Sequence, residues 1–220
     1  PEIVASHWHS RTLRLFDPDG PTDADGADGW QLQIPQSNQG NAGGPPTVAD
    51  FDGDGELEIG IASELAYVAF ETDGSVLWTQ TCIDASSRQT GSSVFDFDGD
   101  GAAEVLYADE EDLRIFDGAT GSVRFVVHDH GSGTGVEYPV IADVNRDGRA
   151  EIVLASNNYY RGPWNGVHVL GARDDTWSSA PPVWNQHAYS VDGIRADLSV
   201  PAVPARRFGS FRAAEWGEGE

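Results

Sequence analysis

The sequence predicts an all-β fold built from repeated sheets of four short antiparallel strands. Two observations support this prediction. An acidic motif begins at Asp50, Asp96 and Asp143, so consecutive copies start 46 and 47 residues apart. Between the copies, apolar runs alternate with Gly- and Asp-rich turns, as in strands joined by hairpins. A unit of about 45 residues with four strands is typical of a β-propeller blade. We therefore expect a partial propeller of about four blades and part of a fifth.

The three motifs have the chemistry of calcium loops. They read D-F-D-G-D-G-E-L-E (50–58), D-F-D-G-D-G-A-A-E (96–104) and D-V-N-R-D-G-R-A-E (143–151). Hard oxygen ligands at such density suit Ca²⁺, which takes six to eight of them. We predict about three Ca²⁺, bound through the side chains at positions 1, 3, 5 and 9 and the main-chain carbonyl at position 7. These ligands are Asp50, Asp52, Asp54, Glu56 and Glu58; Asp96, Asp98, Asp100, Ala102 and Glu104; and Asp143, Asn145, Asp147, Arg149 and Glu151.

The glutamate at position 9 distinguishes these loops from helix–loop–helix calcium sites, where the glutamate stands at position 12. Here the ninth residue opens an apolar run such as E-V-L-Y-A, so the loops join strands. The alternative is that they are solvated Asp-Gly turns without an ion. The third loop has neutral Asn145 at position 3 and Arg146 beside it, and we expect it to bind calcium most weakly.

At these motifs the sequence resembles the FG-GAP/VCBS repeats. The resemblance rests on Pro46–Ile59, on the segment 93–105 and on Pro139–Ile152. It implies blades of an integrin-α-like β-propeller with calcium in the loops, and it extends over most of residues 1–197. Such propellers usually close a ring of seven blades, more than this chain contains. Either a partner chain, a second copy or further residues complete the ring, or the chain forms a short open array.

The units follow one another along the chain. We expect them at about 1–45, 46–92, 93–138 and 139–180, with a partial unit at 181–197 and a tail or linker at 198–220. The start at Glu2-Ile3-Val4 matches the residues after each acidic loop, so the first unit should begin in mid-repeat. The acidic stretch 17–29 reads as an expanded turn. Residues 181–197 have the layout of a first strand whose acidic positions are lost. Trp78, Phe125 and Trp177 take equivalent strand positions and should belong to the core.

Composition restricts the partners and the location. The net charge is −23, and eleven of the 36 acidic residues are predicted to bind calcium through their side chains. Such a charge excludes nucleic acid and anionic membranes as favourable partners. No apolar run approaches the length of a membrane span, and Cys82 is the only cysteine, so no intrachain disulfide can form. Because calcium loops of this kind fill at extracellular calcium levels, we expect a secreted or cell-surface bacterial protein.

One loop is longer than its counterparts and is a candidate ligand site. Unit four inserts S-N-N-Y-Y-R-G-P-W-N-G (156–166) between its second and third strands, on the rim opposite the acidic loops. Aromatic rings beside amides and an arginine could stack on sugars or anchor a protein. The alternative is packing against neighbouring blades. The predicted ligand-binding residues are Tyr159, Tyr160, Arg161 and Trp164.

Catalysis is not predicted, because the sequence has no G-x-S-x-G, phosphate loop or zinc-protease motif. The predicted function is a calcium-binding, non-catalytic adhesion or protein-interaction module. One alternative is a carbohydrate-binding module or lectin. The other is part of a polysaccharide-active enzyme, which rests on fold analogy alone.

Overall fold

The described part of the chain is all-β and antiparallel, in a computed structural model that describes residues 3–17, 28–35, 43–133, 138–157, 163–184, 187, 189, 194 and 197–200. These residues form four separate sheets and no helix. Sheet 1 contains β1 (Ile3–His7), β2 (Thr12–Asp17) and β3 (Asp28–Gln33), and sheet 2 contains β4 (Thr47–Ala49), β5 (Glu58–Ala62), β6 (Ala66–Phe70) and β7 (Val76–Thr81). Sheet 3 contains β8 (Ser93–Phe95), β9 (Glu104–Ala108), β10 (Leu113–Phe116) and β11 (Val123–Val127), and sheet 4 contains β12 (Val140–Ala142), β13 (Glu151–Ser156) and β14 (Gly166–Gly171).

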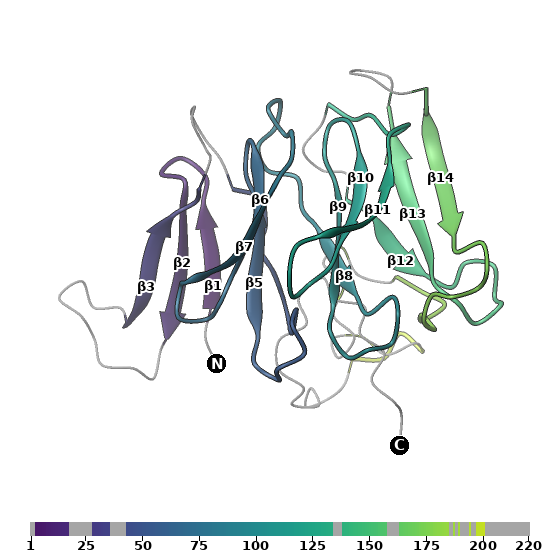
Figure 1. The fold of residues 1–220 in the computed structure, drawn as a ribbon, viewed down its shortest axis with the longest axis horizontal. Coiled ribbons are helices and arrows are strands. Elements are labelled where there is room, and N and C mark those ends of the chain that lie inside the picture. The colour runs from purple at the N-terminus through teal and green to yellow at the C-terminus, as the bar shows by residue number, and fades with distance from the viewer. Residues whose placement is uncertain are drawn as a thin grey trace.

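The sheets stand side by side in chain order, from purple to green in Figure 1. Within each sheet the strands also follow chain order, and each pairs with the next. The first strands of adjacent units converge, because β8 contacts both β4 and β12. A buried hydrogen bond of 2.7 Å between the hydroxyls of Thr47 and Ser92 links sheet 2 to sheet 3 there. The sheets therefore pack face to face with their first strands closest together.

The core consists of three layers between the four sheets, and β9 shows why. Val105 and Tyr107 enter the layer shared with sheet 2, whereas Leu106 and Ala108 enter the layer shared with sheet 4. Successive side chains of a strand point to opposite faces, so a sheet covered on both sides needs a continuous apolar run. All five residues of β9 are buried, as are those of β5 and β6.

Aromatic rings fill the layer between sheets 2 and 3. Tyr67 stacks on Trp78 with ring centroids 5.7 Å apart and lies 5.4 Å from the ring of Tyr107. The Trp78 indole N–H donates to the Gly118 carbonyl at 2.5 Å, which ties β7 to the turn after β10. Trp78 is buried, while Phe125 and Trp177 are partly buried against the next layer. The three aromatic residues expected in the core therefore pack there.

The prediction of four strands per unit is correct for sheets 2 and 3 and wrong for the described part of sheets 1 and 4, which have three strands each. In sheet 1, β1 pairs with β2 and β2 pairs with β3. In sheet 4, no strand forms at Trp177. Instead Ser178 donates to the Phe97 carbonyl at 2.8 Å, and its own carbonyl accepts from Ala150 at 3.0 Å.

Ring closure is not seen. The described strands of sheets 1 and 4 do not contact each other. The described residues of 181–200 are not in strands, so the first strand expected in a fifth unit does not form among them. Pro181 and Pro182 lack the N–H groups that a strand pairing needs. The Pro181 carbonyl instead accepts a bond of 3.0 Å from the amide of Asp143.

Several expectations lie outside the described residues. They are the ninth-position Glu2, most of the acidic turn 17–29 and the tail beyond residue 200. Where the chain is described, no helix is long and apolar enough to cross a membrane.

Candidate metal centres

The three acidic loops occupy equivalent places at one end of the molecule. Residues 50–58 connect β4 to β5, residues 96–104 connect β8 to β9, and residues 143–151 connect β12 to β13. These connections lie at the lower end in Figure 1, and the hairpins that follow β5 and β9 lie at the upper end. In all three loops the ninth-position glutamate is the first residue of a strand, as the sequence predicts.

The loops share one backbone conformation. Position 6 has a positive φ in each loop, at Gly55 (94°), Gly101 (94°) and Gly148 (89°). Position 4 also has a positive φ: it is 77° in the first two loops, where the residue is glycine, and 66° at Arg146 in the third. A non-glycine residue in this region is strained, because its Cβ approaches the following carbonyl. The third loop therefore takes the same path at a greater conformational cost.

Main-chain N–H groups hold the carboxylates of the loops in place. The Asp50 carboxylate accepts from the amides of Gly53 (2.7 Å) and Gly55 (3.0 Å), and that of Asp96 accepts from the same two positions. The Asp143 carboxylate accepts from the amides of Asp147 (3.1 Å) and Gly148 (3.0 Å). The ninth-position glutamate reaches back to position 2: Oε2 of Glu58 accepts from the Phe51 amide at 2.5 Å. The corresponding distances are 2.7 Å for Glu104 and 2.9 Å for Glu151. This scaffold leaves the Oε1 atom of each glutamate for another partner.

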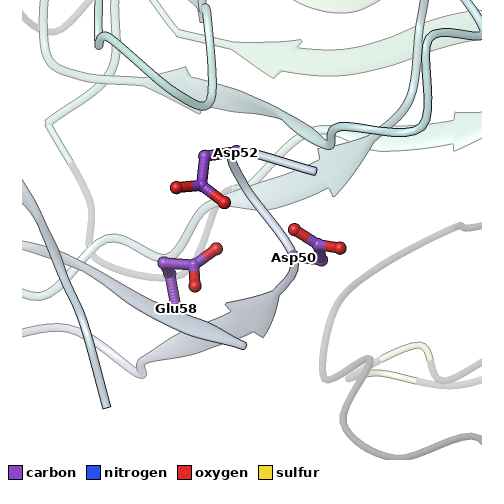
Figure 2. Close-up of side chains that lie close together, drawn as sticks. All are labelled: Asp50, Asp52 and Glu58. Atoms are coloured by element: carbon purple, nitrogen blue, oxygen red, sulfur yellow. The ribbon is translucent and has the colours of Figure 1, made fainter. Parts of the chain in front are cut away.

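In the first loop three carboxylates converge on one point. Asp50, Asp52 and Glu58 each offer an oxygen, and these oxygens lie within 4.8 Å of one another. Figure 2 shows the carboxylates of Asp52 and Glu58 facing each other, with Asp50 beside them. Glu58 is fully buried, and its Oε1 atom has no hydrogen-bond partner among the described residues. A buried carboxylate oxygen without a partner is costly.

Electrostatics at the first loop favour a cation. The pKa of Glu58 is raised to about 7, chiefly by burial and also by the charges of Asp52, Glu71 and Asp50, against the effect of the Phe51 amide. The half-buried Glu71 follows β6, and its pKa is also raised, by burial and by Asp52 and Asp54. The residues fit a hard divalent cation, which would supply the missing partner of Oε1 and neutralise the carboxylates. The loop 50–58 is thus a sound candidate for calcium.

The second loop has the same carboxylates and an additional cation. Oxygens of Asp96, Asp98 and Glu104 again lie within 4.8 Å of one another. However, Nη1 of Arg124 donates to Oε1 of Glu104 at 2.8 Å and also to Asp98. Burial raises the pKa of Glu104 to about 7, while the Phe97 amide and Arg124 act in the opposite direction. The protein therefore places its own positive charge against two of the candidate ligands.

The third loop does not assemble three carboxylates among the described residues. The Asn145 amide stands at position 3, and its Nδ2 donates to Asp147 (2.8 Å) and to Oε1 of Glu151 (3.0 Å). A cavity of about 260 Å³ lies beside the loop, lined among others by Arg149 and Trp177. The amide donor satisfies the glutamate without an ion. This contact is consistent with the expectation that the third loop binds calcium most weakly. The order of affinities stays a prediction.

The remaining predicted ligands are not part of these clusters. The position-5 carboxylates of Asp54, Asp100 and Asp147 accept from the position-7 amides at 2.8–2.9 Å. Coordination by the position-7 carbonyls of Glu56, Ala102 and Arg149 stays a prediction. Sequence reasoning missed Glu71 and Arg124, because neither lies in a motif. The signal for Glu71 was present, since it follows Phe70 as Asp117 follows Phe116.

The predicted aromatic ligand site is described only in part. Tyr159, Tyr160 and Arg161 lie outside the described residues. Trp164 is partly buried, and its ring stacks on that of His168 with centroids 4.3 Å apart. Its amide donates to the Asp129 carbonyl at 3.2 Å. This end of the molecule is opposite the acidic loops, as predicted from the strand order.

Comparisons with known proteins agree with the repeat motifs. The crystal structure of the V. cholerae biofilm matrix protein Bap1 is similar, with 26% sequence identity and a TM-score of 0.66; the match covers 93% of this chain and 39% of that one. This chain thus spans about two fifths of that protein. The Bacillus licheniformis rhamnogalacturonan lyase PL11 has 17% identity and a TM-score of 0.43, with 77% of this chain and 41% of that one covered.

None of the curated proteins matches the sequence. A family model of the FG-GAP-like repeat matches residues 67–154, a stretch that includes the second and third acidic loops. Residues 67–154 therefore contain FG-GAP-like repeat sequence, as the motifs there predicted.

Proposed function

We propose that this chain is a calcium-stabilised adhesion or interaction module that acts outside the cell. The observation that carries most weight is the unpartnered, fully buried Oε1 of Glu58 beside Asp50 and Asp52. A solvated turn would not bury a carboxylate in this way, because the lost hydration has no compensation without a cation. In this proposal calcium has a structural role, and the first loop is its principal site.

Similarity to a biofilm matrix protein supports the extracellular and adhesive part of the proposal. Extracellular calcium is abundant enough to fill modest sites permanently, so a module that depends on calcium for stability suits that location. The similarity covers less than half of the matrix protein, so the partner of this chain has to be found by experiment.

We also propose that the four sheets are blades of a β-propeller. Their face-to-face packing and the converging first strands β4, β8 and β12 support this arrangement. The domain division expected from the sequence, with repeats to residue 197 and a tail at 198–220, belongs to the same proposal. A partner chain or a second copy would then complete the ring.

Calcium binding can be tested directly by isothermal titration of the chelator-treated protein together with thermal melts in calcium and in EDTA. The proposal predicts saturable binding and a melting temperature that falls by many degrees in EDTA, because the loop carboxylates then repel one another at close range. Magnesium at equal concentration is the control, since it accepts this kind of flexible oxygen site less readily. Identical melts in calcium and EDTA would overturn the structural role.

The partner should bind at the rim opposite the loops, where Trp164 lies. A protein or a glycan could stack on this aromatic surface. A glycan array probed in calcium and in EDTA tests the carbohydrate form. Binding that survives EDTA at a temperature where the protein stays folded would indicate that calcium supports the surface without touching the ligand.

A further inference from the structure

The three loops differ in what contacts one particular atom, the Oε1 of the ninth-position glutamate. In the first loop this atom has no partner among the described residues. In the second it accepts from the Arg124 guanidinium, and in the third from the Asn145 amide. Because the backbone follows the same path in all three loops, these contacts distinguish the loops from one another. The difference between the first two loops comes from a residue outside the acidic motif.

Arg124 reaches the second loop from a β-bulge. The pairing of β10 with β11 shifts register after Ile115 and leaves Arg124 as the extra residue between Val123 and Phe125. The pairing of β6 with β7 shifts at the same place, and there the extra residue is Leu77. A bulge redirects a side chain away from the regular alternation. Leu77 and Arg124 are thus structurally equivalent, and Leu77 packs against the apolar core.

Arg124 is held in position by a second carboxylate. Its Nε and Nη2 donate to Oδ2 of Asp117 at 2.9 and 2.6 Å. Asp117 is fixed in turn by the amide and hydroxyl of Thr120, at 2.9 and 2.7 Å. This double contact aims Nη1 at Asp98 and Glu104 and limits the freedom of the guanidinium to leave. Glu71 takes the place of Asp117 in sheet 2, where the bulge residue is Leu77 and provides no charge for it.

Arg124 and calcium cannot use the same oxygens. A calcium ion would lie within about 2.3–2.6 Å of its oxygen ligands, and Nη1 already lies 2.8 Å from Oε1 of Glu104. Two cations this close also repel each other strongly in a partly buried site. Calcium must therefore displace Nη1 from the second loop, whereas it meets no competing side-chain cation in the described surroundings of the first.

We infer that Arg124 is an internal cation of the loop 96–104, which neutralises Asp98 and Glu104 when calcium is absent and competes with calcium for them. The loop 50–58, with Leu77 at the equivalent bulge, then fills at lower calcium concentration. This inference rests on the proposed calcium function. It attributes the difference in calcium affinity between the two loops to one equivalent position, which is Leu77 on β7 of sheet 2 and Arg124 on β11 of sheet 3.

The test exchanges the two bulge residues and uses calcium alone as the probe. Calcium is titrated calorimetrically, with a competing chelator, into the full chain, into Arg124→Leu and into Leu77→Arg. Glu58→Gln is combined with Arg124→Leu so that the affinity of the second loop is read without the first. Arg14→Leu serves as a matched control: Arg14 lies on β2 over the ring of Phe16, and its replacement removes the same charge from a sheet that is joined to neither loop.

We expect Arg124→Leu to tighten the second loop by about tenfold or more, with or without Glu58→Gln, and Leu77→Arg to weaken the first loop by a similar factor. In EDTA, Arg124→Leu should melt at a lower temperature than the unchanged protein. In the calcium titrations, Arg14→Leu should have the same affinity as the unchanged protein. The inference would be overturned if the unchanged protein binds calcium and both Arg124→Leu and Leu77→Arg bind it with the same dissociation constants as the unchanged protein. A lack of calcium binding in the unchanged protein would instead overturn the proposed function.

Discussion

Replacing Glu58 with Gln should change stability in opposite directions with and without calcium. Glutamine keeps the size of the side chain and an oxygen that can accept from the Phe51 amide. It removes the charge that is buried next to Asp50 and Asp52. Without calcium this charge only costs free energy, whereas with calcium it is a ligand. The substitution therefore separates the two roles of one side chain.

The magnitude follows from the pKa of Glu58, which burial raises from 4.5 to about 7. A carboxyl group with a raised folded-state pKa stabilises the protein fully below its unfolded pKa, and this contribution is lost as the pH rises through the folded pKa. At pH 8 the ionised group costs about 3 kcal/mol, at about 1.4 kcal/mol for each pKa unit. Since the glutamine amide must also be buried, we expect a gain of about 1–3 kcal/mol in EDTA, or about 2–12 °C in melting temperature for a chain of this size.

The assay is calorimetric melting at pH 8 in EDTA and in excess calcium. Glu56→Gln is the matched control, because Glu56 belongs to the same loop and carries the same charge but is exposed. It should shift both melts only slightly. Glu58→Gln should melt above the unchanged protein in EDTA and below it in calcium. A variant that is destabilised equally in both conditions would refute the reasoning, since Glu58 would then be a structural residue unrelated to a cation.

Three further predictions concern pH, backbone strain and the aromatic rim. The apparent calcium affinity should fall as the pH is lowered from 8 to about 5.5, because Glu58 and Glu104, with pKa values of about 7, take up protons that calcium must displace. Calcium titrations at several pH values should show a weaker dependence of affinity on pH in Glu58→Gln than in the unchanged protein. Arg146→Gly should raise the free energy of unfolding by about 1 kcal/mol in urea, since the residue has a φ of 66°; an unchanged or lower value would contradict the strain. Replacing Tyr160 and Trp164 together by Ala should abolish binding of the partner found by the glycan or protein screen without changing calcium stoichiometry, whereas loss of folding would assign the insertion to the core.

The sequence was sufficient to locate the repeated elements. The spacing of the acidic motifs fixes where β5, β9 and β13 begin, because each starts at a ninth-position glutamate. The continuous apolar runs after these glutamates predict strands buried on both faces, and the layers on either side of β9 bear this out. These features are local, so a motif and a period of two residues are enough to predict them.

Features that depend on distant pairing were not predictable. Arg124 follows the second motif by twenty residues, and only the register of β10 and β11 shows that it lies at a bulge. The third strand of sheet 4 was expected to be followed by a fourth at Trp177, but the ring of Trp177 packs against Phe97, 5.0 Å away, instead. The strand pattern was present there, and tertiary packing overrode it.

Calcium at one loop should also affect the interface between sheets, because the loops are bonded to one another through the main chain. The Asp50 carbonyl accepts from the Ala103 amide in the second loop at 2.9 Å. The second and third loops are linked through Ser178, which bonds to Phe97 and to Ala150. An ion that orders Asp50 therefore also holds the first residue of its loop against the neighbouring repeat. Repulsion among the carboxylates after calcium removal would strain these bonds as well as the loop itself, and the sheets of such an array are stabilised mainly by their neighbours. The melting temperature of the whole chain is for this reason a sensitive measure of occupancy at a single loop.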